Sequence, residues 1–320
     1  MTANREPGKI NENTTLIDTA MFGVAGTNAV FLVEGEEKTC LIDAGTDADV
    51  PRIIKTLKQL NSFPPDYVLL THAHWDHSQG ISKMRQKASR EFEVFASEKS
   101  IPLLEDQSWN AFADPKQKFH NIFDVTPLKE GETVDLGGVT LKIYESPGHI
   151  KDHIVILDEQ TKNLFIGDAI GNKLGDQAFL SACYPPFFSK EDFYATLDKL
   201  KGIDYETLSL SHFGYITGDE ARTILDEARM ILDQYWGIFE TAEQEDKLAD
   251  IKYIIELLKQ ELQPVFPDLK VKKFMMRFML GLIGGGRKII RKPPLVLSEI
   301  LLADVLAWQV EAFKIAKGIE

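Results

Sequence analysis

The chain has 320 residues, of which 44% are hydrophobic, so it can bury a core larger than that of one small domain. Its 49 acidic residues outnumber its 36 basic residues, and the formal net charge of −13 argues against general affinity for a polyanion such as nucleic acid. Two cysteines, Cys40 and Cys183, exclude the dense disulfide framework of small secreted proteins.

The N-terminal segment is polar and lacks the apolar stretch that a secretory signal contains. The longest apolar stretch, residues 274–283, is interrupted by Arg277 and Gly281 and is about half of the ~20 residues that a membrane-spanning helix needs. The sequence therefore predicts a soluble, cytoplasmic protein that has no membrane partner.

Residues 1–217 alternate short runs of β-branched residues with helical stretches, which is typical of an α/β domain. Two segments of this region, 28–45 and 153–171, resemble each other, because both read as strand, charged turn and strand and end on an aspartate close to glycine. From residue 218 onward apolar residues recur at three- and four-residue spacing, which predicts helices. We expect one domain at 1–217 and a helical C-terminal region at 218–320.

A group of potential metal ligands follows an apolar run that ends at Leu70, in the segment THAHWDHSQG. His72 and His74 are two residues apart, so both imidazoles project to the same side of an extended backbone. Asp76 and His77 lie at the turn into the next helix and point differently. One short loop can thus offer two nitrogens to one metal ion and a carboxylate and a nitrogen to a second ion.

This pattern, His-x-His-x-Asp-His, resembles the metallo-β-lactamase superfamily, and the resemblance covers roughly residues 15–218. Later segments of the same family pattern carry a histidine after a Pro-Gly turn, an aspartate at a strand end and a histidine at another strand end. The resemblance implies an α/β fold (α+β, a four-layer αββα sandwich) with a C-terminal α-helical extension. It also implies two divalent metal ions, with His72, His74 and His149 at the first, Asp76, His77 and His212 at the second, and Asp168 bridging them.

The resemblance assigns supporting roles to two further residues. Asp43 stands at the end of the segment CLIDAG, where the family has an aspartate that orders the ligand loop without binding metal. His153 matches a second histidine of the family, with a supporting role favoured over direct substrate contact. His120 matches no motif and is interpreted as incidental.

Two metal ions that share an oxygen ligand lower the pKa of bound water toward neutrality, so hydroxide is available at pH 7. We therefore expect a hydrolase that uses a hydroxide bridging two metal ions, oriented by Asp76, to cleave an ester, thioester or lactone bond of a small molecule. The nitrogen-rich ligand set favours zinc, with iron and manganese as alternatives. The sequence has no G-x-S-x-G nucleophile elbow, which argues against the main competing hydrolytic mechanism.

Residues 145–171 resemble the glyoxalase II group of thioesterases, but the Gly-Arg-Phe signature that helps this group bind glutathione is missing after Asp168. The loop SACYPPFF at 181–188 is a candidate pocket wall. We predict that Tyr184 is catalytic through a hydrogen bond and binds substrate together with Phe187 and Phe188. The alternative, equally open, is that these aromatic residues cover the helical tail.

Residues 270–292 gather eight basic residues in an otherwise acidic chain. An anion-binding surface is one interpretation, and it leads to an alternative function as a phosphodiesterase or nuclease. An amphipathic helix that packs, or that forms a homodimer through the C-terminal helices, is the favoured interpretation. A third class of function is an iron-dependent sulfur oxygenase or a non-hydrolytic metal-binding protein.

Overall fold

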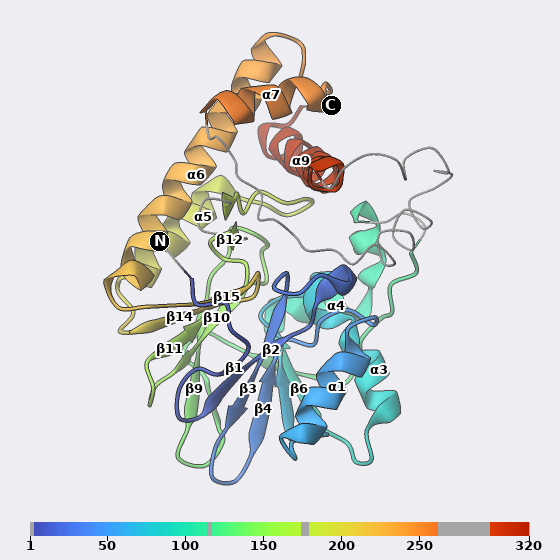
Figure 1. Ribbon diagram of the computed structural model, residues 1–320, viewed down its shortest axis with the longest axis vertical. Coiled ribbons are helices and arrows are strands. Elements are labelled where there is room, and N and C mark those ends of the chain that lie inside the picture. Colours follow the sequence, from blue (N-terminus) through green and yellow to red (C-terminus); the bar gives the residue numbers. More distant parts are fainter. Residues whose placement is uncertain (1–2, 114–116, 174–178, 262–294, 320) are drawn as a thin grey trace.

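The computed structural model describes residues 3–113, 117–173, 179–261 and 295–319. Its center is a pair of stacked β-sheets (Figure 1). The seven-stranded sheet has the order β1 (Gly8–Lys9), β2 (Thr14–Asp18), β3 (Ala29–Glu34), β4 (Thr39–Ile42), β5 (Tyr67–Leu69), β6 (Glu93–Ser97) and β7 (Val125–Leu128). The six-stranded sheet has the order β15 (Gly214–Thr217), β14 (Thr207–Leu210), β11 (Asn163–Phe165), β10 (Ile154–Asp158), β9 (Thr140–Glu145) and β8 (Thr133–Asp135).

Both sheets are mixed. In the first, β4, β5, β6 and β7 run parallel to one another, and β1 to β4 pair antiparallel. In the second, β11 and β14 are parallel and their neighbours are antiparallel. A separate short pair joins β12 (Asn172–Lys173) to β13 (Phe179–Leu180). Because parallel strands end at the same edge of a sheet, the residues that follow β11 and β14 lie side by side.

The core has three parts that follow from the alternation of side chains across the strands. One part fills the space between the sheets and includes Phe31, Cys40 and Phe165. A second lies between the first sheet and its covering helices, and a third between the second sheet and the helices of its outer face. The four-layer αββα sandwich with C-terminal helices is thereby confirmed.

The helices cover the outer faces of the two sheets (Figure 1). On the first sheet these are α1 (Val50–Gln59), α3 (Gly80–Lys87) and α4 (Ile101–Glu105), with α2 (Trp75–Ser78) just before α3. On the second they are α5 (Lys190–Lys201) and α6 (Asp219–Gln244), while α7 (Ile251–Glu261) and α9 (Leu295–Lys317) pack on α6 beyond the end of the sheets. The short 3-10 helices are η1 (Met21–Gly23), η2 (Glu98–Ser100) and η3 (Gln107–Phe112).

Local sequence explains where two of these helices begin. Pro51 stands in the first turn of α1, where its missing N–H costs no hydrogen bond. The Ser189 side chain caps α5 by accepting a hydrogen bond from the backbone N–H of Asp192. The cap fixes the start of α5 directly after the loop at residues 181–188.

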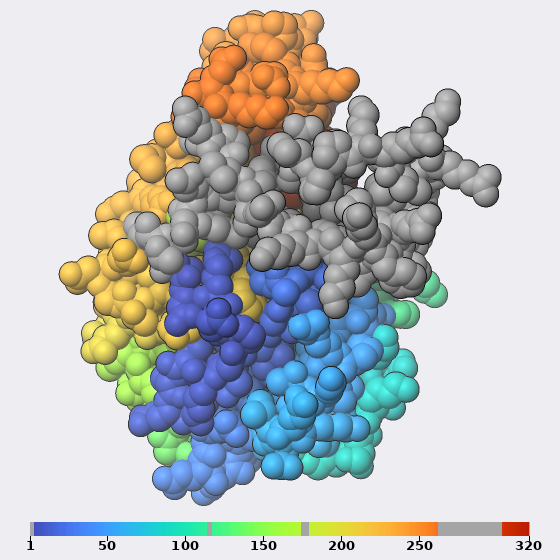
Figure 2. Space-filling view, viewed as in Figure 1, coloured from blue at the N-terminus to red at the C-terminus, as the bar shows by residue number. Residues whose placement is uncertain are grey.

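The C-terminal helices pack on one another, and α6 joins them to the second sheet through its contact with β15. α6 and α7 contact each other, α9 contacts both, and their apolar residues belong to the same core as the outer face of this sheet. Figure 2 shows α6 and α7, yellow to orange, along one side and the top of the molecule. The division into two domains at residues 217 and 218 stays a prediction. No helix among the described residues is long and apolar enough to cross a membrane.

Candidate metal centre

Seven predicted ligands come together at one end of the two sheets. His72, His74, Asp76 and His77 follow β5 of the first sheet, whereas His149 lies between β9 and β10 of the second. Asp168 and His212 follow the parallel strands β11 and β14, whose ends are aligned by the pairing of Phe165 with Ser209. Strand ends of both sheets therefore supply the site.

Three histidines form the first cluster of ring nitrogens. His72 Nε2 lies 2.8 Å from His74 Nδ1, and His149 Nε2 lies 2.9 Å from the same atom. All three side chains are buried. Three nitrogens that face one another in this way could hold one metal ion.

The second cluster combines histidines with carboxylates. His212 Nε2 lies 3.4 Å from Oδ2 of Asp76 and 3.4 Å from Oδ2 of Asp168. His77 Nε2 lies 3.7 Å and 3.5 Å from the same two oxygens. Asp76, His77 and His212 thus form a second group that could hold a metal ion.

Asp168 lies between the two clusters. Its Oδ2 is 3.5 Å from His77 Nε2 of the second cluster and 3.7 Å from His149 Nε2 of the first. One carboxylate can therefore reach both metal positions, as the sequence predicts for this residue.

Four of the histidines have an oxygen partner on the nitrogen that faces away from the clusters. Nδ1 of His72 contacts Thr71 Oγ1 at 3.0 Å, and Nδ1 of His77 contacts Asp43 Oδ2 at 2.8 Å. Nδ1 of His149 contacts the Ala182 carbonyl at 2.9 Å, and Nδ1 of His212 contacts the Thr27 carbonyl at 2.9 Å. With a proton on each of these nitrogens, the Nε2 lone pair faces the cluster. Such partners fix the tautomer and orientation of a metal-binding histidine.

Burial and charge divide the histidines into two electrostatic groups. Burial lowers the pKa of His72 well below its ordinary value and that of His74 to about 3, so both rings are neutral at pH 7. Burial also disfavours the charged form of His212, but the carboxylates of Asp168 and Asp76 raise its pKa to about 10. Without metal the second cluster therefore holds protons that a bound cation would displace.

The unpartnered atoms of the centre fit two metal ions. His77 and His212 each have a buried Nε2 that faces the second cluster and has no hydrogen-bond partner, and the buried Asp168 Oδ1 has none either. Buried polar atoms are normally paired, so these unpartnered atoms need an explanation. Nitrogen and carboxylate ligands in two adjoining groups account for it, and the buried clusters are consistent with a dinuclear metal site.

Two glycines let the chain approach the ligands closely. Gly148 precedes His149 at φ +141°, and a Cβ there would lie 2.5 Å from the Phe193 Cα of α5. Gly167 precedes Asp168 at φ +54°, and a Cβ there would lie 2.5 Å from His153 Nε2. Only glycine combines such a backbone conformation with this lack of space.

Asp43 supports the ligand loop through hydrogen bonds, at the position that the sequence indicates. Its carboxylate accepts hydrogen bonds from the Thr71 backbone N–H at 2.8 Å and contacts His77 Nδ1 at 2.8 Å. Asp43 has φ 61°, a conformation that non-glycine residues rarely adopt. Such an outlier persists where the surroundings hold it in place, here through these hydrogen bonds.

His153 supports Asp168. Its Nε2 accepts the backbone N–H of Asp168 at 3.0 Å, and its Nδ1 contacts Ser146 Oγ at 2.7 Å. The ring also stacks on His72, with 4.9 Å between ring centroids. Both nitrogens are thus occupied within the protein. His120, which matches no motif, lies at the surface with Nε2 3.3 Å from Asp47 Oδ2.

The predicted substrate residues of the loop 181–188 have different surroundings. The Tyr184 ring lies 5.5 Å from the His149 ring, and Phe187 lies 5.7 Å from the Trp109 ring. Phe188 instead packs against Phe193 and Trp236 in the core of the second sheet. The contacts of Phe188 therefore favour packing, while the substrate roles of all three aromatic residues stay predictions.

Sequence analysis missed three aromatic residues near the centre. Trp109 and Phe112 of η3 lie 5.4 Å and 5.9 Å from the His74 ring. Trp308 of α9 lies 6.0 Å from Phe112. Apart from the aromatic residue types themselves, no local pattern signals these contacts, because η3 and α9 are far apart in the sequence.

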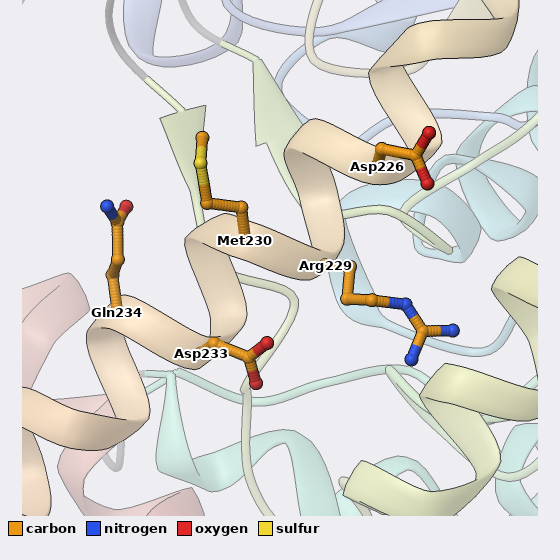
Figure 3. Close-up of a pocket in the computed structure, with 5 residues that line it drawn as sticks. All are labelled: Asp226, Arg229, Met230, Asp233 and Gln234. Atoms are coloured by element: carbon orange, nitrogen blue, oxygen red, sulfur yellow. The ribbon is translucent and has the colours of Figure 1, made fainter.

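An open hollow on the surface of α6 is separate from this centre. Asp226, Arg229, Met230, Asp233 and Gln234 line it (Figure 3). None of the candidate ligands contributes to the hollow. It therefore gives no support to a second reactive site.

Residues 23–212 match the family model described as the metallo-beta-lactamase superfamily. The chain is 27% identical over 194 residues to the beta-lactamase-like protein 2 homolog of Caenorhabditis elegans, covering 60% of this chain and 57% of that protein. It is 30% identical over 145 residues to a hydroxyacylglutathione hydrolase of Francisella philomiragia, covering 45% and 48%. An acyl-coenzyme A thioesterase of Gallus gallus is 28% identical over 160 residues, covering 44% and 57%. The chain thus spans about half the length of these curated relatives.

Among solved structures, an archaeal metallo-beta-lactamase superfamily protein from Sulfolobus tokodaii matches with a TM-score of 0.58 at 17% identity. The match covers 95% of this chain and 99% of that one. It therefore extends beyond residue 212 into the helical region, and at this identity it shows the fold alone.

Proposed function

Since the chain belongs to the metallo-beta-lactamase superfamily, we propose that it is a metal-dependent hydrolase that cleaves an ester, thioester or lactone bond of a small molecule. The observation that carries this proposal is the pair of adjoining buried clusters, with Asp168 Oδ2 within 3.7 Å of nitrogens in both. The similarity to a hydroxyacylglutathione hydrolase and an acyl-coenzyme A thioesterase supports a thioester in particular.

The seven ligands would hold two metal ions, which when bound supply an activated water and polarise a carbonyl oxygen. Zinc is the favoured metal because nitrogen ligands predominate, with iron and manganese as alternatives. Asp76 is the candidate to orient the water and accept its proton, since its Oδ2 lies beside His212 and His77 and its side chain is partly exposed.

Tyr184 is the candidate hydrogen-bond donor to the substrate. Burial raises the pKa of its phenol well above the ordinary value, and the charges of Asp168 and Asp76 act in the same direction. The phenol therefore keeps its proton at neutral pH. A protonated phenol beside His149 can stabilise negative charge that develops on a substrate oxygen.

Metal analysis and a substrate panel test this proposal together. The full chain is purified without added metal, analysed for zinc, iron and manganese, reconstituted, and assayed with thioesters, esters, lactones and a phosphodiester. We expect about two metal equivalents per chain, because the seven ligands form two clusters and neither cluster fills a four-coordinate site without a shared ligand. We also expect hydrolysis of a carbonyl substrate.

The panel also separates the alternatives. A single equivalent after reconstitution would reject the dinuclear centre, and cleavage of the phosphodiester alone would favour a phosphodiesterase or nuclease. Oxygen uptake with a persulfide by iron-loaded protein would favour a sulfur oxygenase. Metal binding without turnover of any substrate would favour a non-hydrolytic metal-binding protein.

A further inference from the structure

Aromatic side chains from three separate segments form a continuous series beside the first cluster. Trp109 lies 5.4 Å from His74 and 5.7 Å from Phe187. Phe112 lies 5.9 Å from His74 and meets Trp308 edge-on at 6.0 Å. We call Trp109, Phe112, Phe187 and Trp308 the aromatic wall. It runs from a metal-cluster histidine to the C-terminal helix.

The burial of the wall differs from that of core aromatic residues. All four rings are half-buried, whereas Phe193, Phe239 and Phe313 in the core of the second sheet are fully buried. Tryptophan is rarely fully buried even in structural positions, so exposure alone does not indicate a subsite, and the position of the wall beside His74 matters as well. Trp109 and Phe112 are partly accessible next to His74, and Phe187 and Trp308 extend this partly accessible surface away from the candidate centre, which is where an apolar group of a substrate would pack.

The position of Trp308 is fixed by the residue that follows it. Gln309 is buried, and its Nε2 donates a hydrogen bond of 2.8 Å to the Ser181 carbonyl. The Gln309 carbonyl lies 3.7 Å from Cys183 Sγ. Between these two contacts lies Ala182, whose carbonyl contacts His149 Nδ1 at 2.9 Å. The segment that orients a metal-cluster histidine therefore also fixes α9.

We propose that the aromatic wall is an apolar substrate subsite and that Trp308 of α9 determines a preference for substrates with an apolar group next to the bond that is cleaved. This inference rests on the proposed hydrolase function. The apolar group can belong to the acyl part or to the leaving group, since both flank the scissile bond. A pocket that loses contact with an apolar chain discriminates less well between long and short chains.

The test measures kcat/KM of the metal-loaded full chain in two arms. One arm compares acetyl with decanoyl thioesters of the same small hydrophilic thiol, and the other compares acetyl thioesters of a hydrophilic and an alkyl thiol. We expect Trp308→Ala to lower the preference for the apolar substrate about tenfold in one arm. Trp308→Phe should restore part of this preference because it retains a ring at the wall.

A control variant and a binding measurement keep the result unambiguous. Ile315→Ala removes an exposed apolar side chain from the same helix and should leave the preference unchanged. Calorimetric binding of decanoate should be weaker in Trp308→Ala than in wild type. If Trp308→Ala loses its native circular dichroism, Phe112→Ala provides the same test from η3.

The outcomes separate this inference from the function on which it rests. An unchanged substrate preference in both arms, or unchanged decanoate affinity, in folded Trp308→Ala would overturn the role of Trp308. If the wild type cleaves no substrate of either arm, thioester hydrolysis fails, and the proposed function fails as well if the esters and lactones of the panel are not cleaved; decanoate binding alone then decides whether the wall is an apolar subsite.

Discussion

Asp168 is the residue on which both clusters depend. Its Oδ2 faces His149 of the first cluster and His77 and His212 of the second, at 3.4 to 3.7 Å. Burial alone would raise the pKa of Asp168, but the charges of His212 and His77 hold it well below its ordinary range. The carboxylate is thus ionised and available to cations at neutral pH.

Asp168→Ala should remove metal from both positions and lower the rate of hydrolysis at least about 100-fold. The reason is that losing a bridging ligand lowers metal affinity and activity more than losing a residue that only supports a ligand. The fold should persist, since the residue follows a strand end and lies outside the apolar clusters. Elemental analysis, turnover and circular dichroism measure this. Asp204→Ala, at an exposed surface position, is the matched control. A folded variant with two metal equivalents and normal turnover would contradict the bridging role.

Asp152 is a buried carboxylate that supports the ligand loop. Its Oδ2 accepts hydrogen bonds from the Ala73 N–H at 3.0 Å and from Ser100 Oγ at 2.6 Å. Its Oδ1 is buried without a partner, and burial raises the pKa to about 6. The native state therefore holds this proton more tightly than the unfolded chain does. Protein stability due to Asp152 is highest below pH 4 and falls as the pH rises toward and past 6.

Asp152→Asn should remove this dependence, so the free energy of unfolding of the variant relative to wild type should rise by up to about 3 kcal/mol between pH 4 and pH 7. Urea unfolding of both proteins at several pH values measures the difference in the free energy of unfolding. The contributions of the other titrating groups are the same in both proteins and cancel in this difference. Asp204→Asn is the exposed control. A constant difference across this range would show that Asp152 titrates normally.

At the scale of elements, the residues of the two clusters could be predicted because each belongs to a short local pattern beside a strand. His72 and His74 follow β5 within five residues, and Asp168 follows β11 within three. The wall and its anchor could not be predicted. Gln309 and Ser181 are 128 residues apart, and their contact depends on how α9 packs, which apolar periodicity alone does not specify. The basic segment 270–292 lies outside the described residues, so its packing role stays a prediction.

Gln309→Leu should lower the free energy of unfolding by about 1 to 3 kcal/mol, because the buried Ser181 carbonyl loses its donor. It should also weaken metal binding, since Ala182, next to Ser181, holds His149. Urea unfolding and metal titration measure the two effects. Glu311→Gln, at an exposed position of α9, should change neither. Wild-type stability and metal affinity in Gln309→Leu would show that α9 does not fix this segment.

At the scale of the whole molecule, the candidate metal centre lies where the two halves of the sandwich meet. His72, His74, Asp76 and His77 come from the first sheet, and the remaining ligands come from the second. Metal binding should therefore stabilise the packing of one sheet on the other, because a ligand that binds only the folded state shifts the folding equilibrium toward it. The homodimer through the C-terminal helices stays a prediction.

From the net charge of −13 we predict that the whole molecule does not bind nucleic acid at micromolar concentration. The eight cations of residues 270–292 must overcome repulsion between phosphates and the rest of an acidic surface. Fluorescence anisotropy with labelled single- and double-stranded nucleic acid, over a range of salt concentrations, measures this directly. Real binding would weaken steeply with salt as counterions are released. Micromolar binding that disappears when Arg287, Lys288, Arg291 and Lys292 are replaced by Ala would show the prediction to be wrong and would favour the nuclease alternative.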